Sequence, residues 1–204
     1  MKCKYITIER EYGAGGSQIA QRLSEICGIP CYGKEILEAV AKSQKISVDS
    51  IEKYEETVTN SFLYTIFMMS RAQSGNTEML TQEEHIYLAE QKEIQNFADK
   101  GSAIFVGHCA SEALKNRKNV VNVYILADIE DKKKRIRQEY KIPASEAEST
   151  RKRFDKKRAN YYYANTGKKW DDLRNYSLVL DSSRLGVEGC AAVLKSLLEM
   201  KEES

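Results

Sequence analysis

A glycine cluster near the N-terminus constrains the fold of this chain more than any other feature. The β-rich run Tyr5–Ile8 leads into the four residues Gly13, Ala14, Gly15 and Gly16. Apolar residues then recur at helical spacing until Gly28. The order strand, glycine turn, helix is typical of the first unit of an α/β domain.

Further strands are predicted along the rest of the chain. The runs Ala103–Val106 and Val120–Ala127 are almost continuously apolar, as expected of parallel strands buried on both faces. A final strand is predicted at Tyr176–Leu180 and a very short one at Pro30–Tyr32. Strands that alternate with helices predict a three-layer α/β domain with a parallel sheet.

Two helical segments interrupt this alternation. From Lys34 to about Phe97 the pattern is mostly helical, which predicts an insertion over about 34–100. A second segment, about 142–170, is basic and follows a helix whose start Asp128 is expected to cap. With no linker or repeat in sight, we expect residues 1–204 to form a single domain.

Composition excludes several classes of protein. The chain has 204 residues, of which 42% are hydrophobic and 30% charged, and only two are proline. Its mean hydropathy of -0.55 argues against a membrane protein, and the composition argues against collagen or a disordered chain. The N-terminus lacks the apolar core of a signal peptide, so a cytoplasmic location is predicted.

Charge is unevenly distributed. The net charge is only +2, which does not indicate nucleic acid or anionic lipid as a partner of the whole chain. Between Lys132 and Arg174, however, fifteen basic residues face six acidic ones. This segment is therefore predicted to meet anions.

Cysteine and histidine usage argues against a zinc site. The five cysteines include no C-x-x-C pair and lie mostly in apolar stretches, which is typical of reduced core thiols. The two histidines, His85 and His108, are far apart in sequence and near no cysteine pair.

The glycine cluster lies where α/β folds bind phosphate, because backbone N–H groups converge at the start of the following helix. Against the pattern G-x-x-x-x-G-K-[ST], Gly15 and Ser17 fit. Arg10 stands at the first glycine and Gly16 replaces the lysine. A tight turn that only packs helix on strand is the alternative interpretation.

The run Ile8–Ser17, I-E-R-E-Y-G-A-G-G-S, resembles the signature I-S-R-x-Y-G-S-G-G of the cytidylate kinase-like family. This family is a branch of the P-loop nucleoside monophosphate kinases. Further similar segments follow in the family's order: Tyr32 with Lys34–Ile36, Val106 with Gly107 and Cys109, Asp155 with Arg158, and Asp181–Leu185. Gly33 and His108 depart from the family pattern, which has aspartate and arginine there.

The resemblance implies a P-loop kinase fold and an ATP-dependent, magnesium-dependent transfer of phosphate to a nucleoside monophosphate. Phosphoryl transfer mainly needs positioning and neutralised charge. The resemblance assigns the donor phosphates to the N–H groups of Gly13, Ala14, Gly15, Gly16 and Ser17, with the Ser17 hydroxyl on Mg²⁺. Arg10 is the expected replacement for the missing lysine, because a guanidinium can bridge two phosphate oxygens.

The basic segment resembles a lid helix. Arg151, Asp155 and Arg158 fall on one helical face, and the family's chemistry implies catalytic roles for them. Arg153 is a predicted substrate contact on a neighbouring face, and Arg135 with Arg137 are further phosphate candidates. A solvated charged helix is the structural alternative.

The acceptor is expected at Lys34 and His108, which follow predicted strands at the carboxyl edge of the sheet. Glu11, Glu112 and Asp128 are the candidate carboxylates near Mg²⁺. The aromatic run Phe62–Met69 favours a core or subunit contact, and thus a homodimer.

Three classes of function remain open at this point. The leading hypothesis is a kinase that phosphorylates a nucleoside monophosphate or a similar small acceptor, with cytidylate as the default acceptor by resemblance. The second is a nucleotide-binding regulator with little catalysis, because Gly16 removes the loop ammonium. The third, an RNA-binding module built on 151–169, lacks an RNA-recognition signature, so nucleic acid is the least favoured partner.

Overall fold

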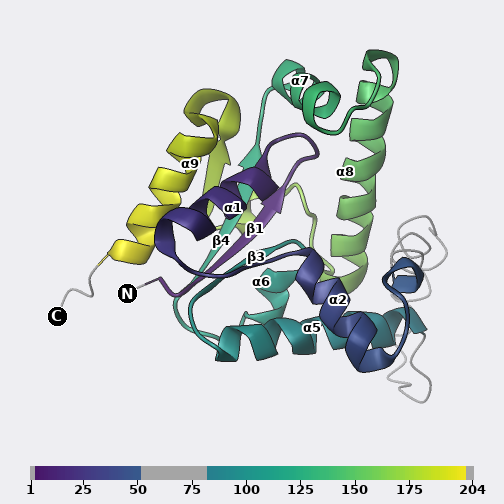
Figure 1. Cartoon of the computed structure of the whole chain (residues 1–204), viewed down its shortest axis with the longest axis vertical. Coiled ribbons are helices and arrows are strands. Elements are labelled where there is room, and N and C mark those ends of the chain that lie inside the picture. The colour runs from purple at the N-terminus through teal and green to yellow at the C-terminus, as the bar shows by residue number, and fades with distance from the viewer. Residues whose placement is uncertain (1–2, 52–81, 201–204) are drawn as a thin grey trace.

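A five-stranded parallel sheet forms the centre of the protein in a computed structural model that describes residues 3–51 and 82–200 (Figure 1). The strands lie in the order β2-β3-β1-β4-β5, and every neighbouring pair is parallel. They are β1 Tyr5–Arg10, β2 Cys31–Tyr32, β3 Ala103–Val106, β4 Val120–Leu126 and β5 Leu178–Asp181. The predicted α/β fold with a parallel sheet is confirmed.

Helices cover both faces of this sheet (Figure 1). Helices α1 and α9 pack together over one face, and α5 and α6 lie against the other. The described helices are α1 Gly16–Cys27, α2 Lys34–Gln44, α5 Gln82–Asp99, α6 Ala110–Ala113, α7 Ile129–Glu139, α8 Ala144–Thr166 and α9 Ser182–Glu199, with a 3-10 turn at Leu173–Asn175. No helix in these ranges is long and apolar enough to cross a membrane.

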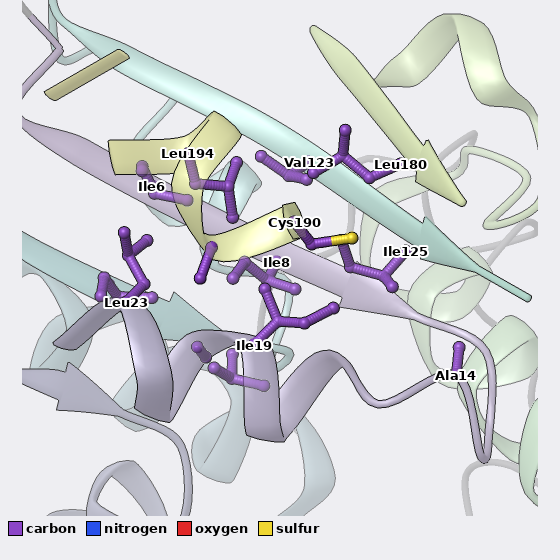
Figure 2. Packing of buried hydrophobic residues seen from close by; sticks show 14 of the residues in the cluster. Ile6, Ile8, Ala14, Ile19, Leu23, Val123, Ile125, Leu180, Cys190 and Leu194 are labelled. Carbon is purple, nitrogen blue, oxygen red and sulfur yellow. The ribbon is translucent and has the colours of Figure 1, made fainter. Parts of the chain in front are cut away.

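The main core shows why the first unit folds as the sequence predicts. Ile6 and Ile8 alternate along β1 onto one face, where α1 presents Ile19 and Leu23 one helical turn apart (Figure 2). Leu194 of α9, the helix that packs beside α1, completes this layer. All five side chains are fully buried. Full burial of such a side chain contributes about 1.5–3 kcal/mol, so this layer fixes the glycine turn against the sheet.

The glycine turn occupies the point where the strand order reverses. Strand β1 lies between β3 and β4, so chain segments diverge to opposite sides at its carboxyl end. Gly13 and Gly15 both have positive φ, at 84° and 79°. A Cβ on Gly13 would lie 2.8 Å from the Lys132 carbonyl oxygen, so glycine is required by space as well as by conformation.

Two local expectations were wrong in detail. The last strand begins at Leu178 and not at Tyr176, because the Tyr176 N–H donates to the Leu173 carbonyl and closes the 3-10 turn. Asp128 precedes α7 as expected, but its side chain makes no capping hydrogen bond. Its N–H instead donates to the Ser183 hydroxyl at 2.8 Å.

The predicted insertion is described at its two ends. Helices α2 and α5 pack on each other through a small apolar cluster that includes Leu37, Val40 and Ile86. The run Phe62–Met69 lies outside the described residues. The extent of the insertion therefore stays a prediction.

Candidate active site

The start of α1 offers unused backbone donors to an anion. Gly15 precedes the helix in the left-handed conformation and no side chain caps it. The first bond into the helix runs from the Ile19 N–H to the Gly15 carbonyl at 2.9 Å. Among the described residues, the N–H groups of Gly16, Ser17 and Gln18 find no acceptor. Such a helix start is an anion-binding site by geometry and by dipole.

Arg10 fills the space that a loop lysine would need. A Cβ on Gly16 would lie 2.6 Å from the Arg10 Cβ and 2.7 Å from its Cγ. A Cβ on Gly107 would lie 2.5 Å from the Arg10 Nη1. The side chain of Arg10 therefore runs from the glycine turn to the end of β3, and both glycines give it room.

The guanidinium of Arg10 has no counter-ion among the residues that the structure describes. Its Nε is buried and has no hydrogen-bond partner among the described residues. Arg158 lies beside it, with Nη1 donating to the Arg10 carbonyl at 2.9 Å. Burial, and next the positive charge of Arg10, lower the pKa of Arg158 to about 10. Within the described part of the chain neither arginine forms an ion pair, so together they can receive an anion.

A cavity of about 500 Å³ adjoins these two arginines. It lies between the start of α1, the start of α2, the end of β3 and the middle of α8. Both predicted acceptor residues, Lys34 and His108, line it together with Ser17. The other charged or polar lining residues are Glu9, Arg10, Gln21, Glu35, Lys157, Arg158, Tyr161 and Tyr162. The cavity is a suitable size for a small ligand.

Asp155 ties the lid helix to the glycine turn. Its Oδ1 accepts a hydrogen bond from the Tyr12 N–H at 2.6 Å, and its Oδ2 accepts one from Arg151 Nη1 at 3.1 Å. The Phe154 ring stacks on the Tyr12 ring with centroids 4.4 Å apart. Burial raises the pKa of Asp155, although the Tyr12 N–H and Arg158 oppose the rise.

The predicted arginines divide into two groups. Arg151 shares the face of Asp155, as its spacing indicates, but Glu148 and Asp155 both neutralise it and it lies outside the cavity lining. Arg153 is exposed and its guanidinium lies 5.3 Å from the Phe154 ring centroid. Only Arg158 of the lid arginines reaches the cavity.

Arg135 contacts the loop from helix α7. Its Nη1 donates to the Gly13 carbonyl at 2.5 Å. Its Cζ would lie 3.1 Å from a Cβ on Gly15, so the side chain crosses directly over the turn. Arg137, on the same helix, is exposed and does not line the cavity.

Two of the three candidate carboxylates for Mg²⁺, Glu11 and Glu112, are engaged elsewhere. Glu11 Oε2 accepts hydrogen bonds from Lys132 Nζ at 2.7 Å and from the Ala127 N–H at 3.1 Å. Glu112 pairs with two lysines, and Asp128 is exposed. No group of three acidic, histidine or cysteine side chains that could hold a metal occurs in 3–51 or 82–200.

Glu90, a buried carboxylate next to His108, was not identified from the sequence. Glu90 is fully buried, accepts a hydrogen bond from the Tyr161 hydroxyl, and lies with Oε1 3.5 Å from His108 Nδ1. Gly107, His108 and Cys109 all have positive φ, which is strained for the last two residues. No sequence signal marks Glu90, because it lies among many polar residues of α5.

The glycine turn, the arginine pair and the adjoining cavity are features suited to a phosphotransferase that acts on a small substrate. More specifically, the chain belongs to the cytidylate kinase-like family, whose sequence profile matches residues 5–184. No match was found among curated proteins.

Several solved structures share the fold of this chain. An uncharacterized protein from Eubacterium ventriosum is 25% identical, with a TM-score of 0.71 over 97% of this chain and 99% of that one. Shikimate kinase from Bacteroides thetaiotaomicron is 10% identical, with a TM-score of 0.52 over 96% and 98%. A sugar kinase from Janibacter sp. HTCC2649 is 16% identical, with a TM-score of 0.51 over 97% and 95%. The last two likenesses concern the fold alone.

Proposed function

We propose that this protein transfers the γ-phosphate of ATP to a nucleoside monophosphate, with cytidylate as the default acceptor. The observation that supports this proposal most strongly is the position of the Arg10 side chain. Its side chain begins against Gly16 of the phosphate-binding turn and ends against Gly107, beside the cavity. A group transferred between the turn and the cavity would therefore pass a guanidinium whose Nε has no hydrogen-bond partner in the described part of the chain.

The turn is suited to the phosphates of ATP, which supplies the transferable phosphoryl group when it is bound. The free N–H groups of Gly16 and Ser17 would receive the phosphate oxygens, and Gly13 to Gly15 keep the backbone open to close approach. Arg10 would take the role of the absent lysine, and Arg158 would meet the charge that develops on the transferred group.

The acceptor is assigned to the cavity. Lys34 and His108 would hold it, and Arg153 would contact it only after the lid helix rearranges, because its side chain lies outside the lining. Arg151 and Asp155 are assigned to positioning, since Asp155 joins Arg151 to the Tyr12 N–H. Of the proposed magnesium ligands, only the exposed Ser17 hydroxyl is available at the turn, so the ion would be held mainly by phosphate oxygens.

Product formation tests the proposal directly. ADP release with ATP and Mg²⁺ would be measured for CMP, UMP, AMP and GMP as acceptors, and we expect one of them to be used preferentially. Arg10→Ala should lower turnover by about 10²–10³-fold, the usual effect of removing one donor to a developing charge. Arg22→Ala, a surface arginine paired with Glu188, is the matched control. Turnover of Arg10→Ala close to that of the control would exclude the assigned role.

A nucleotide-binding regulator is the second candidate, and one observation favours it. The space at Gly16 is closed to any side chain, so the loop cannot present a lysine without displacing Arg10. A regulator would be stabilised by Mg-ADP in a thermal-shift assay but would release no ADP with any acceptor.

A further inference from the structure

Glu9 is an acidic side chain in a cavity otherwise dominated by cations. It is the penultimate residue of β1, is only 7% exposed, and lines the cavity beside Arg10. Aromatic side chains surround it on the inner side, including Tyr124, Tyr162 and Trp170. A carboxylate in such a position is costly unless its oxygens are matched by donors.

Only one of its two oxygens is matched by the described part of the protein. Glu9 Oε2 accepts a hydrogen bond from Trp170 Nε1 at 3.1 Å. Oε1 receives none from the residues in 3–51 and 82–200, and it is not among the side-chain atoms sealed from solvent. Since Glu9 lines the cavity, the open oxygen is available to a ligand there.

The charges around Glu9 define what kind of group it can receive. The carboxylate opposes the lowering of the Arg158 pKa, which shows that the two charges interact, yet they form no ion pair within 4.0 Å. The nearby guanidinium groups of Arg10 and Arg158 make a metal cation an unfavourable occupant. An anionic group at the arginines and a hydrogen-bond donor at Glu9 would satisfy both parts of the cavity at once.

We propose that Glu9 is a specificity-determining residue that accepts a hydrogen bond from the base amino group or the 2′-hydroxyl group of the phosphorylated acceptor. This inference rests on the proposed function and deepens it, because it requires an acceptor with a donor group beside its anionic one. The signature I-S-R of the family has serine where this chain has Glu9, so the feature belongs to this chain's own sequence. Serine would offer a neutral hydroxyl in place of a carboxylate.

Binding to four ligands distinguishes the candidate donors. Dissociation constants would be measured by calorimetry for CMP, UMP, dCMP and ribose 5-phosphate with the whole chain and with Glu9→Gln and Glu9→Ser. Glutamine retains an acceptor for the Trp170 N–H but loses the negative charge. We expect Glu9→Gln to weaken the matching ligands by about 10–100-fold, the range of a charge-assisted hydrogen bond. Glu38→Gln, at an exposed position of α2, is the matched control.

The pattern of losses identifies the donor. A loss for both CMP and dCMP that UMP and ribose 5-phosphate do not share indicates the base amino group. A loss for CMP, UMP and ribose 5-phosphate that spares dCMP indicates the 2′-hydroxyl. Equal losses for all four ligands, no loss for any, or no binding to the unmodified chain would overturn the proposal.

Two further measurements separate a role of Glu9 in specificity from a purely structural role and from the kinase activity itself. If Glu9 served only to hold Trp170, Trp170→Phe would lower Tm, whereas Glu9→Gln, which keeps an acceptor for the Trp170 N–H, would lower it less, and neither would change the ranking of ligands. ADP release tests the proposed function separately. A ligand-dependent effect of Glu9→Gln without ADP release would support Glu9 and reject the kinase, whereas ADP release with a ranking insensitive to Glu9 would do the reverse.

Discussion

Adding a single methyl group at Gly16 should disturb both stability and turnover, because Arg10 already occupies that space. In Gly16→Ala the new Cβ would lie 2.6 Å from the Arg10 Cβ and 2.7 Å from its Cγ. The shorter approach is about 0.8 Å inside the 3.4 Å limit of ordinary contact. Both atoms lie next to the β1 backbone, so rotation of the guanidinium end cannot relieve the contact.

The magnitude follows from the cost of overpacking. One additional methyl in a filled site costs about 1–3 kcal/mol, which for a domain of this size lowers Tm by about 2–12 °C. Gly16 does not have a positive φ, so backbone strain does not contribute. Because Arg10 must shift, turnover in the ADP-release assay should fall by about 10²-fold, near the effect of losing the group.

Two comparisons make this result interpretable. Gly189→Ala introduces alanine into helix α9, where the Cβ meets only Leu185 at 3.3 Å, and it should leave turnover unchanged. In an Arg10→Gly background, which removes the obstructing atoms, Gly16→Ala should cost less than about 0.5 kcal/mol. Gly16→Ala with unchanged Tm and turnover would refute the assignment of this space to Arg10.

The ion pairs around the turn give two further predictions. Burial raises the pKa of Asp155. The folded chain therefore keeps the carboxyl proton of Asp155 at pH values where the unfolded chain has released it. As pH rises and the folded chain also loses this proton, the contribution of Asp155 to stability declines. The stability of Asp155→Asn relative to the unmodified chain, measured by urea unfolding, should therefore increase as pH rises above about 3.9, the ordinary pKa of an aspartate carboxyl, and a constant or decreasing difference would contradict this reasoning. Lys132 is nearly buried whereas Glu11 is partly exposed, so Glu11→Ala, which strands the ammonium, should cost about 3–5 kcal/mol and more than Lys132→Ala. Equal losses in the same unfolding experiment would mean that the buried charge is not the dominant cost.

The fold was largely predictable because local patterns and tertiary packing agree. The continuous apolar character of Ala103–Val106 and the helical spacing of Ile19 and Leu23 correspond to positions that are fully or almost fully buried. The errors occur where a single hydrogen bond decides the outcome. Tyr176 has the composition of a strand residue, but its N–H is captured by the Leu173 carbonyl, which no periodicity reveals.

The site was predictable only in part, since its decisive contacts join distant segments. The glycine turn and the shared face of Arg151 and Asp155 follow from spacing. That Arg10 extends to Gly107 depends on the pairing of β1 with β3, which local sequence cannot specify. The neutralisation of Arg151 and the open oxygen of Glu9 likewise depend on where other side chains lie.

Helix α8 extends over 23 residues, about 35 Å, without an internal break. Near its middle Asp155 contacts the Tyr12 N–H, and less than two turns further on Tyr161 contacts Glu90, the partner of His108. Because α8 is a continuous helix, a displacement at one of these two contacts also displaces the other. Any event that moves α8 away from the glycine turn will therefore also shift Tyr161 relative to Glu90, the residue next to His108. The turn and the His108 side of the cavity will therefore respond together.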